Sequence, residues 1–396
     1  MSFLKNFNRC DLFVGIWALY MLQGVLYPQG IINQLLQLIM ILWGMIVFGR
    51  YVFKQLKLSP FLKSVSMLCL MYIIYGVINI LCGREDFGSF HVSSFIYLKN
   101  SLNSLLPIFV FYDLSRRGFL TTDKIKKYII LFIPLTVVLF VKFQSLMLLD
   151  SGKDEMTNNL GYMFVSLLPY VYFFYRRPLF QYVIIGILMT FVAVAVKRGA
   201  ILIFILGTVY FLFTTFKNGS RRKKIVNILL LLILITFVYY LIQYRIEASE
   251  YFALRIESTI DGDSSGRDVI YNTIWNEIIQ ETNVFEFLFG RGANSTIAIA
   301  GNYAHQDWLE TLCNNGVLGG VVILYFFVSL LGLIKKSYRA IDPYMFDSFL
   351  TLSFIILAKT IFSMSIQNLD LYQSLLLGFL VYESTKSCRE DLSLIS

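Results

Sequence analysis

Long apolar runs, separated by short polar and basic segments, make up most of the chain. A helix needs about twenty residues to cross ~30 Å of hydrocarbon, so each run of that order predicts a membrane-spanning helix. No barrel-like alternation of side chains is visible, which favours helices over strands. The pattern predicts an all-α polytopic bundle of about twelve spans, at residues 11–27, 31–53, 61–83, 93–114, 128–148, 160–175, 180–196, 200–216, 225–244, 316–334, 348–364 and 371–384.

One long polar segment interrupts this alternation of apolar runs and short connections. Residues 245–315 separate the ninth and tenth predicted spans and are too long for a plain connection between helices. The sequence therefore divides into spans one to nine (1–244), a large, partly helical loop (245–315), and spans ten to twelve with a tail (316–396).

Composition supports a membrane environment. Of the 396 residues, 57% are hydrophobic and 15% are charged, whereas soluble domains are about a quarter charged. The net charge of +9 needs no nucleic-acid partner, because cytoplasmic loops of membrane proteins are normally basic. Basic residues gather in alternate connections, which predicts cytoplasmic termini and an extracytoplasmic large loop. The five scattered cysteines form no disulfide framework or zinc spacing.

Several cations lie where this charge rule disfavours them. Lys197 and Arg198 occupy a predicted outer turn, and Lys99, Lys142 and Lys359 fall inside spans. Lys99 and Lys142 lie near span ends, where a long side chain can reach the interface instead of binding anything. Lys359 lies deeper, which favours a functional role. Together these cations predict an anion site in the outer half of the bundle.

The first part of the large loop predicts a turn over 261–266 and an amphipathic helix over 267–280. We expect its apolar stripe to comprise Val269, Ile270, Ile274, Trp275 and Ile278. Arg267 falls in the first turn of that helix. An arginine beside exposed backbone N–H groups forms a good phosphate-binding site. The alternative is a surface arginine that contacts only solvent.

A second arginine is flanked by glycines, in Gly290-Arg291-Gly292. Glycines let the backbone and a guanidinium approach a ligand closely, or they form a simple turn.

The end of the loop holds one of the two histidines of the chain, His305. Its ordinary pKa near 6.5 allows it to accept a proton at physiological pH. A short helix is predicted over 306–314, with Gly316 as its C-cap. Asp307 and Glu310 on that helix are rival acid–base or binding groups. Their spacing does not form a metal site, and none is expected.

Four motifs in this order resemble the O-antigen ligase and polymerase superfamily. They are Lys197-Arg198-Gly199, Ser265-Gly266-Arg267 with Trp275, Gly290-Arg291-Gly292, and Ala304-His305-Gln306-Asp307-Trp308-Leu309-Glu310 followed by Gly316-Val317-Leu318-Gly319. The resemblance covers about residues 190–320. One departure is Gln306, where many relatives carry asparagine.

The resemblance implies ten to fourteen helices, a large periplasmic loop, and transfer of a glycan from undecaprenyl diphosphate with inversion and without a metal or cofactor. It implies that Arg198 and Arg267 hold the donor diphosphate and that His305 lies beside the acceptor. We therefore expect His305, Arg267 and Arg198 to be catalytic. Lys197, Arg291, Lys359, Asp307 and Glu310 are the expected substrate-binding residues.

Within that family we expect a polymerase of lipid-linked repeat units, for O-antigen or capsular polysaccharide. The ligase that moves finished polymer to lipid A-core is the alternative, and a transporter or flippase of lipid-linked sugars is the rival from another class. The expected partners are the undecaprenyl-diphosphate-linked oligosaccharide, membrane lipids and a chain-length regulator protein. The expected location is the bacterial inner membrane, with the active site on the periplasmic face.

Overall fold

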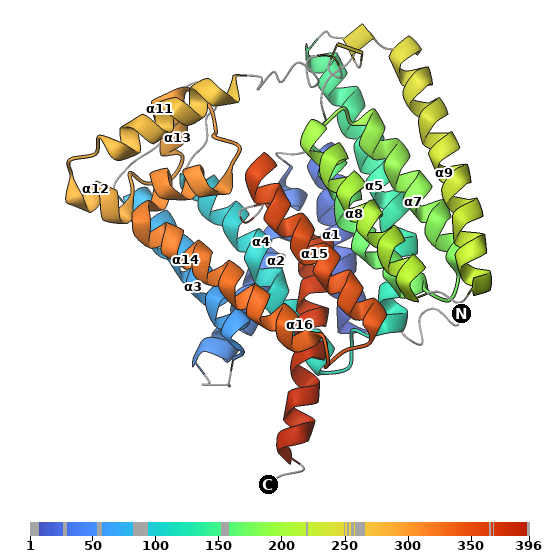
Figure 1. Ribbon diagram of the computed structural model, residues 1–396. Helices are drawn as coiled ribbons and strands as arrows, with labels where there is room; N and C mark the ends of the chain where they lie inside the picture. The colour runs from blue at the N-terminus through green and yellow to red at the C-terminus, as the bar shows by residue number, and fades with distance from the viewer. Residues whose placement is uncertain are drawn as a thin grey trace. The chain divides into compact units, whose positions relative to one another are not determined.

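The computed structural model describes residues 8–26, 30–53, 58–81, 94–151, 158–218, 221–248, 250–251, 253–254, 257, 266–363, 366 and 368–393. Over these residues the chain forms helices and no strand (Figure 1). Contacts divide the chain into two compact units, and each is described by itself. The first unit comprises residues 1–37, 114–263 and 341–355, and the second comprises 38–113, 264–340 and 356–396.

The helices follow the predicted apolar runs closely. Their bounds are α1 Arg9–Leu26, α2 Ile31–Phe53, α3 Pro60–Leu81, α4 Ser94–Arg116, α5 Thr122–Ser151, α6 Gly161–Leu167, η3 Leu168–Phe174, α7 Pro178–Val194, α8 Arg198–Asn218, α9 Arg221–Ala248, α11 Arg267–Ile279, α12 Val284–Phe289, α13 Ser295–Ala300, α14 Asp307–Ser337, α15 Pro343–Phe362 and α16 Leu371–Ser393.

Within the described residues, eight helices are long and apolar enough to cross a membrane: α1, α2, α3, α5, α8, α9, α14 and α15. The prediction of an all-α membrane protein is thereby confirmed. The count of twelve spans and the orientation of the chain stay predictions.

One predicted span has an unexpected form. Residues 160–175 form α6 and then a 3₁₀ helix, η3, and every residue from Gly161 to Phe174 is buried. Pro169 stands at the junction of the two helices. It removes one backbone N–H, and the tighter 3₁₀ turn follows directly. This short segment packs against α5, α7 and α8 and forms the core of the first unit.

The second unit is built around α4. Its side chains from Leu105 to Phe111 are buried, including that of the helix-internal Pro107. Three neighbouring helices approach α4 through glycines, Gly44 of α2, Gly76 of α3 and Gly378 of α16. Small residues at such crossings let helix backbones come close in membrane proteins. Because α4 faces protein on all sides there, it can carry more polar residues than a lipid-facing helix.

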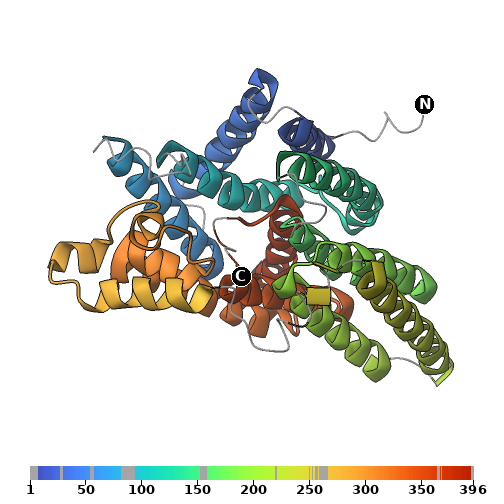
Figure 2. The ribbon, with the colours of Figure 1, turned by 90° about the horizontal axis from the view of Figure 1, so that it is seen from above.

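Helices α3 and α14 run side by side in the second unit (Figures 1 and 2). Phe61 packs on Phe326 with ring centroids 5.3 Å apart, and the hydroxyls of Ser64 and Ser329 lie 2.7 Å apart. The large loop, comprising α11, α12 and α13, packs on the start of α14. The predicted turn at 261–265 lies outside the described residues.

The contact of Gly378 with α4 generates a prediction. A Cβ at this position would lie 2.7 Å from Ile108 O and 2.8 Å from Phe111 Cβ. We expect Gly378→Leu to lower the free energy of unfolding by about 1–3 kcal/mol, because α16 and α4 must separate. Thermal unfolding of the purified protein measures this. Gly332→Leu on α14 is the control, since a Cβ there meets nothing within 4 Å; equal destabilisation of both variants would contradict the prediction.

Candidate functional site

The site rests on a break in α14. Gly316 has φ 66° and ψ −167°, a conformation outside the helical region in the middle of that helix. The predicted short helix thus covers Asp307–Asn315 and ends at Gly316, as expected. Because the backbone turns there, the carbonyls before Gly316 are available to partners outside the helix.

The loop containing Gly290 docks on these carbonyls. Arg291 N donates to Cys313 O at 2.9 Å, and Gly292 N donates to Asn314 O at 3.0 Å. Gly290 (φ 78°) and Gly316 pack backbone against backbone: a Cβ at Gly290 would lie 2.5 Å from Asn315 N. The crossing accounts for both glycines. The sequence had offered ligand approach or a simple turn for Gly290, and a helix C-cap for Gly316.

The same break is tied to the membrane helices. Tyr75 of α3 donates its hydroxyl to Asn315 O at 3.1 Å, and Tyr97 of α4 donates to Asn315 Oδ1 at 3.1 Å. Ser295 N and Ser295 Oγ both donate to Asn314 Oδ1, at 3.0 and 2.8 Å. Sequence analysis missed Asn314 and Asn315. Two amides directly before a predicted glycine cap were the available signal.

His305 lies in a turn that Glu310 organises. Glu310 is 1% exposed, and its carboxylate accepts hydrogen bonds from Ala304 N at 2.6 Å and Thr296 Oγ1 at 2.8 Å. Asn314 Nδ2 donates to it at 3.3 Å. The oxygens of Glu310 thus hold the turn, and its contact with a substrate stays a prediction. His305 itself is partly exposed and has φ 54°, a strained value for a residue with a side chain.

Tyr303 stands beside this histidine, with ring centroids 6.3 Å apart. Burial raises the pKa of Tyr303 to about 12. Its phenol therefore stays protonated at neutral pH and can donate a hydrogen bond, whereas His305 remains the group able to accept a proton.

The start of α11 meets the end of α15. Arg267 Nη1 donates to Phe362 O at 3.1 Å. Among the described residues this is the one hydrogen bond that its guanidinium makes, so further donors are available to an anion. Trp308 Nε1 donates to Thr360 Oγ1 at 3.2 Å, which brings the histidine-bearing segment to the same end of α15.

Asp307 and Lys359 are buried at that end. Lys359 is 5% exposed, and its ammonium donates to Asn368 O at 2.9 Å. The carboxylates of Asp370 and Asp307 interact with it electrostatically. Asp307 Oδ2 in turn accepts from Ile366 N at 3.1 Å. These surroundings do not favour the predicted anion-binding role of Lys359, because the carboxylates already compensate its charge. The acid–base or substrate-binding role of Asp307 stays a prediction.

Arg291 is held by three carboxylates. Its guanidinium lies 2.9 Å from Glu277 Oε2, 2.6 Å from Glu281 Oε2 and 3.3 Å from Glu286 Oε2. The backbone amide of Asn283 and this guanidinium lower the pKa of Glu281, so its carboxylate stays ionised at neutral pH. Arg291 joins α11 to α12, and its acidic surroundings disfavour an anionic ligand at this guanidinium.

The predicted stripe on α11 is only partly correct. Ile274 is fully buried and packs with Ile270 and Ile278 against the cluster of Ala304, Leu309 and Cys313. Val269 and Trp275 are 65% and 47% exposed. The packed face thus follows the i, i+4 positions 270, 274 and 278, joined by Tyr271.

Lys197 and Arg198 belong to the first unit, and the other predicted site residues belong to the second. Arg198 begins α8 and follows a turn in which Val196 has φ 51°. Both cations are partly exposed.

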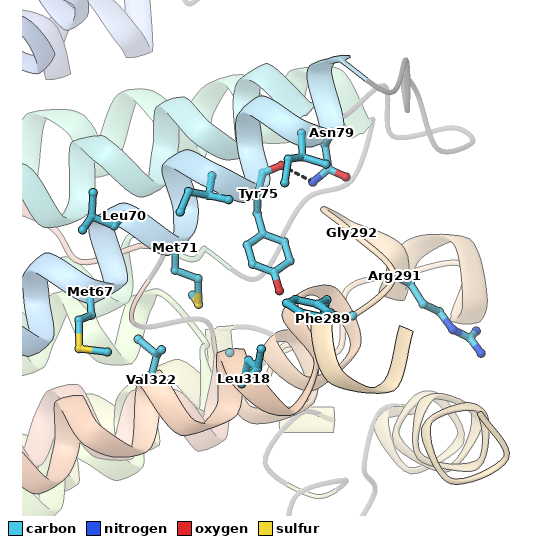
Figure 3. Close-up of a pocket in the computed structure, with 14 residues that line it drawn as sticks. Met67, Leu70, Met71, Tyr75, Asn79, Phe289, Arg291, Gly292, Leu318 and Val322 are labelled. Atoms are coloured by element: carbon cyan, nitrogen blue, oxygen red, sulfur yellow. Dashed lines mark hydrogen bonds between the residues drawn. The ribbon is translucent and has the colours of Figure 1, made fainter. Parts of the chain in front are cut away.

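An apolar groove of about 650 Å³ lies beside the docked loop, between α3 and α14 (Figure 3). Met67, Leu70 and Met71 line one end, and Tyr75, Asn79 and the backbone of Gly290–Gly292 line the other. Figure 3 shows the Tyr75 ring turned toward Phe289 and Leu318, and the Arg291 side chain directed away from the groove. The groove therefore offers apolar walls with one polar end, which suits a lipid chain carrying a polar head.

Comparison with known proteins adds no relative: no known family model matches the chain, and no curated protein matches it. Among the described residues, no group of three or more histidine, cysteine, aspartate or glutamate side chains is arranged to hold a metal ion.

The glycine crossing generates a matched pair of variants. We expect Gly290→Ala to destabilise the protein by more than about 1 kcal/mol, from the positive φ and the contact with α14 together. Gly301→Ala is the control, because Gly301 has φ 70° but nothing within 4 Å of a Cβ. It isolates the backbone strain. The difference between the two thermal unfolding curves measures the destabilisation caused by the contact with α14. Coincident curves would contradict a steric requirement for glycine at position 290.

Proposed function

We propose that the protein polymerises lipid-linked oligosaccharide repeat units, of O-antigen or capsular polysaccharide, on the periplasmic face of a bacterial inner membrane. It transfers the growing glycan from undecaprenyl diphosphate to an acceptor repeat unit. The observation that carries the proposal is the apolar groove between α3 and α14, which ends at the loop carrying the candidate base. A substrate with a long apolar chain and a sugar head suits this combination.

The groove fits a lipid-linked substrate in its chemistry. Leu318 and Ile78 line it and are 45% and 52% exposed, on helices suited to a bilayer. A prenyl chain in the groove buries apolar surface on both sides, worth about 25 cal/mol per Å² relative to water. Lipid already provides much of that environment, so shape complementarity decides where the chain lies.

The transfer needs few groups. The acceptor hydroxyl oxygen forms a bond to the anomeric carbon, and the bond from that carbon to the diphosphate oxygen breaks with its electron pair. The hydroxyl proton passes to His305. Charge grows on the departing diphosphate, and a guanidinium stabilises it through paired N–H donors.

Arg267 is our choice for that guanidinium, because it keeps free donors and shares the second unit with His305. Arg291 is less suited, since three carboxylates already neutralise it. Arg198 and Lys197 remain donor-binding candidates on the family resemblance alone.

Deletion of the gene tests the reaction class. A lipopolysaccharide gel of the deleted host, with a probe for polymer on the lipid carrier, should show a core bearing one repeat and no ladder. Bare core with polymer accumulating on undecaprenyl diphosphate would indicate the ligase instead. An unchanged ladder would exclude a role in O-antigen assembly. Capsular polysaccharide would then be analysed in the same way, and after it the alternative that the protein is a transporter.

The candidate base is tested by His305→Asn. Asparagine tolerates the positive φ of this position, so the turn is preserved while the imidazole is lost. We expect transfer to fall about a hundredfold or more, as for loss of a general base. In vitro polymerisation from synthetic lipid-linked repeats measures this, with Gln280→Asn in the same loop as control. Full activity of His305→Asn would remove the histidine from the mechanism.

The groove is tested by filling it. Leu318→Trp places a larger ring in the groove, and we expect transfer to fall roughly tenfold, since binding energy from the lipid chain is lost. Leu331→Trp is the matched control, because Leu331 is 60% exposed on the same helix and outside the groove lining. Similar activity in both variants would argue against a lipid chain at this place.

A further inference from the structure

A second cavity, of about 470 Å³, lies in the first unit and has no part in the proposed transfer. It is formed by the end of η3, the starts of α7, α9 and α15, and the last turns of α8. The charge pattern predicts that these helix ends are cytoplasmic, opposite to the large loop. Its lining carries more polar side chains than that of the groove at α3 and α14.

The hydrogens of its neutral polar side chains are largely used inside the protein. Thr214 and Thr215 donate their hydroxyls to Phe211 O, at 3.0 and 2.7 Å. Gln181 Nε2 donates to Val171 O at 3.0 Å. For these three side chains, the hydroxyl and amide oxygens are therefore left as acceptors.

One buried acceptor in the lining has no partner in the described part of the chain. Asn227 is 2% exposed, and its Oδ1 atom forms no hydrogen bond with any described residue. A buried amide oxygen left in this state costs about 1–3 kcal/mol. Such an atom indicates that a donor from outside the protein completes the site.

Two carboxylates add negative charge. Asp347 is half-buried and accepts the Tyr210 hydroxyl at 3.0 Å, and Asp342 stands exposed at the mouth. A carboxylate has several acceptor positions, so one bond from a tyrosine leaves capacity for a further donor. Lys217 interacts electrostatically with Asp347 but is not part of the cavity lining. Within the lining, the pair therefore disfavours an anion and favours a cation with N–H donors.

The rim carries one ordered cation. Arg176 Nε donates to Tyr175 Oη at 2.9 Å, and its guanidinium carbon lies 5.4 Å from the Tyr175 ring centroid. Tyr175 stacks on Tyr344 with centroids 4.5 Å apart and 16° between the planes. This stack fixes the guanidinium at the edge of the acceptor-rich cavity, where it can pair with a phosphate.

We infer that this cavity binds a ligand with a primary ammonium next to a phosphate, namely the head group of an aminophospholipid such as phosphatidylethanolamine. The ammonium donates to Asp347, Asp342 and Asn227 Oδ1, and the phosphate pairs with Arg176. A lipid is the source that we commit to, because the cavity lies at the ends of α8, α9 and α15, which are suited to a bilayer. The inference does not rest on the proposed transfer reaction.

The test uses the full chain in nanodiscs of defined composition. Native mass spectrometry counts the lipids that the protein retains from equal mixtures of phosphatidylethanolamine, phosphatidylcholine and phosphatidylglycerol. We expect phosphatidylethanolamine to be preferred roughly tenfold over phosphatidylcholine, which has the same charge but no N–H donors on its nitrogen. Equal retention of these two lipids overturns the inference.

Variants locate the binding. Asp342→Asn and Asp347→Asn should each remove most of the preference, while Asp123→Asn, an exposed aspartate paired with Lys126, should retain it. Tyr210→Phe removes the hydrogen bond to Asp347 but keeps its charge, so it should also retain the preference. If Asp347→Asn does not fold, the exposed Asp342 still decides the outcome. An unchanged preference in Asp342→Asn and any folded Asp347→Asn overturns the site.

The source of the ammonium is tested by competition. Free phosphoethanolamine should displace the lipid only at concentrations far above those of the lipid, because it lacks the acyl chains held by the bilayer. Displacement at equal concentration would overturn the lipid assignment and make a soluble amine the ligand.

Discussion

The backbone crossing of Gly290 and Gly316 is the constraint on which the large loop depends. A helix that breaks leaves carbonyl oxygens without partners, and in a membrane-suited helix this is expensive. Here the oxygens of Cys313, Asn314 and Asn315 accept from two loop amides and from Tyr75. The break and the loop therefore stabilise each other. Neither glycine can carry a side chain, because its Cβ would lie against the backbone of the other segment at the crossing.

The docked loop then sets the chemistry around it. The helical segment before the break carries Glu310, whose buried carboxylate fixes the turn of His305, and Trp308, which binds the end of α15. Arg267 reaches the same helix end from the start of α11. A candidate base and a candidate anion-binding group are thus held by a rigid frame of backbone and buried polar contacts. Preorganisation of this kind is what transfer chemistry without a metal requires.

The sequence predicted the elements well and the side-chain environments poorly. Apolar runs located every long helix, and Gly316 was correctly expected to end a short helix, because periodicity and glycine conformation are local properties. Arg291, Lys359 and Asp307 were expected to meet a substrate, yet each is compensated by charges or carbonyls from distant segments. Residue type alone cannot distinguish a cation awaiting an anion from one already paired. Asn315 shows the converse, since its importance depends on Tyr75 and Tyr97, more than two hundred positions earlier.

The glycine contacts around α4 also have a consequence for biosynthesis. This helix is not among those apolar enough to qualify as a span by itself, within the described residues. Its partner Gly378 lies roughly 270 residues later, a delay of about 15–50 s at ordinary rates of translation. During that interval α4 has α2 and α3 beside it, through Gly44 and Gly76, but lacks α16. The face of α4 that packs on Gly378 therefore stays incomplete until α16 has been synthesised.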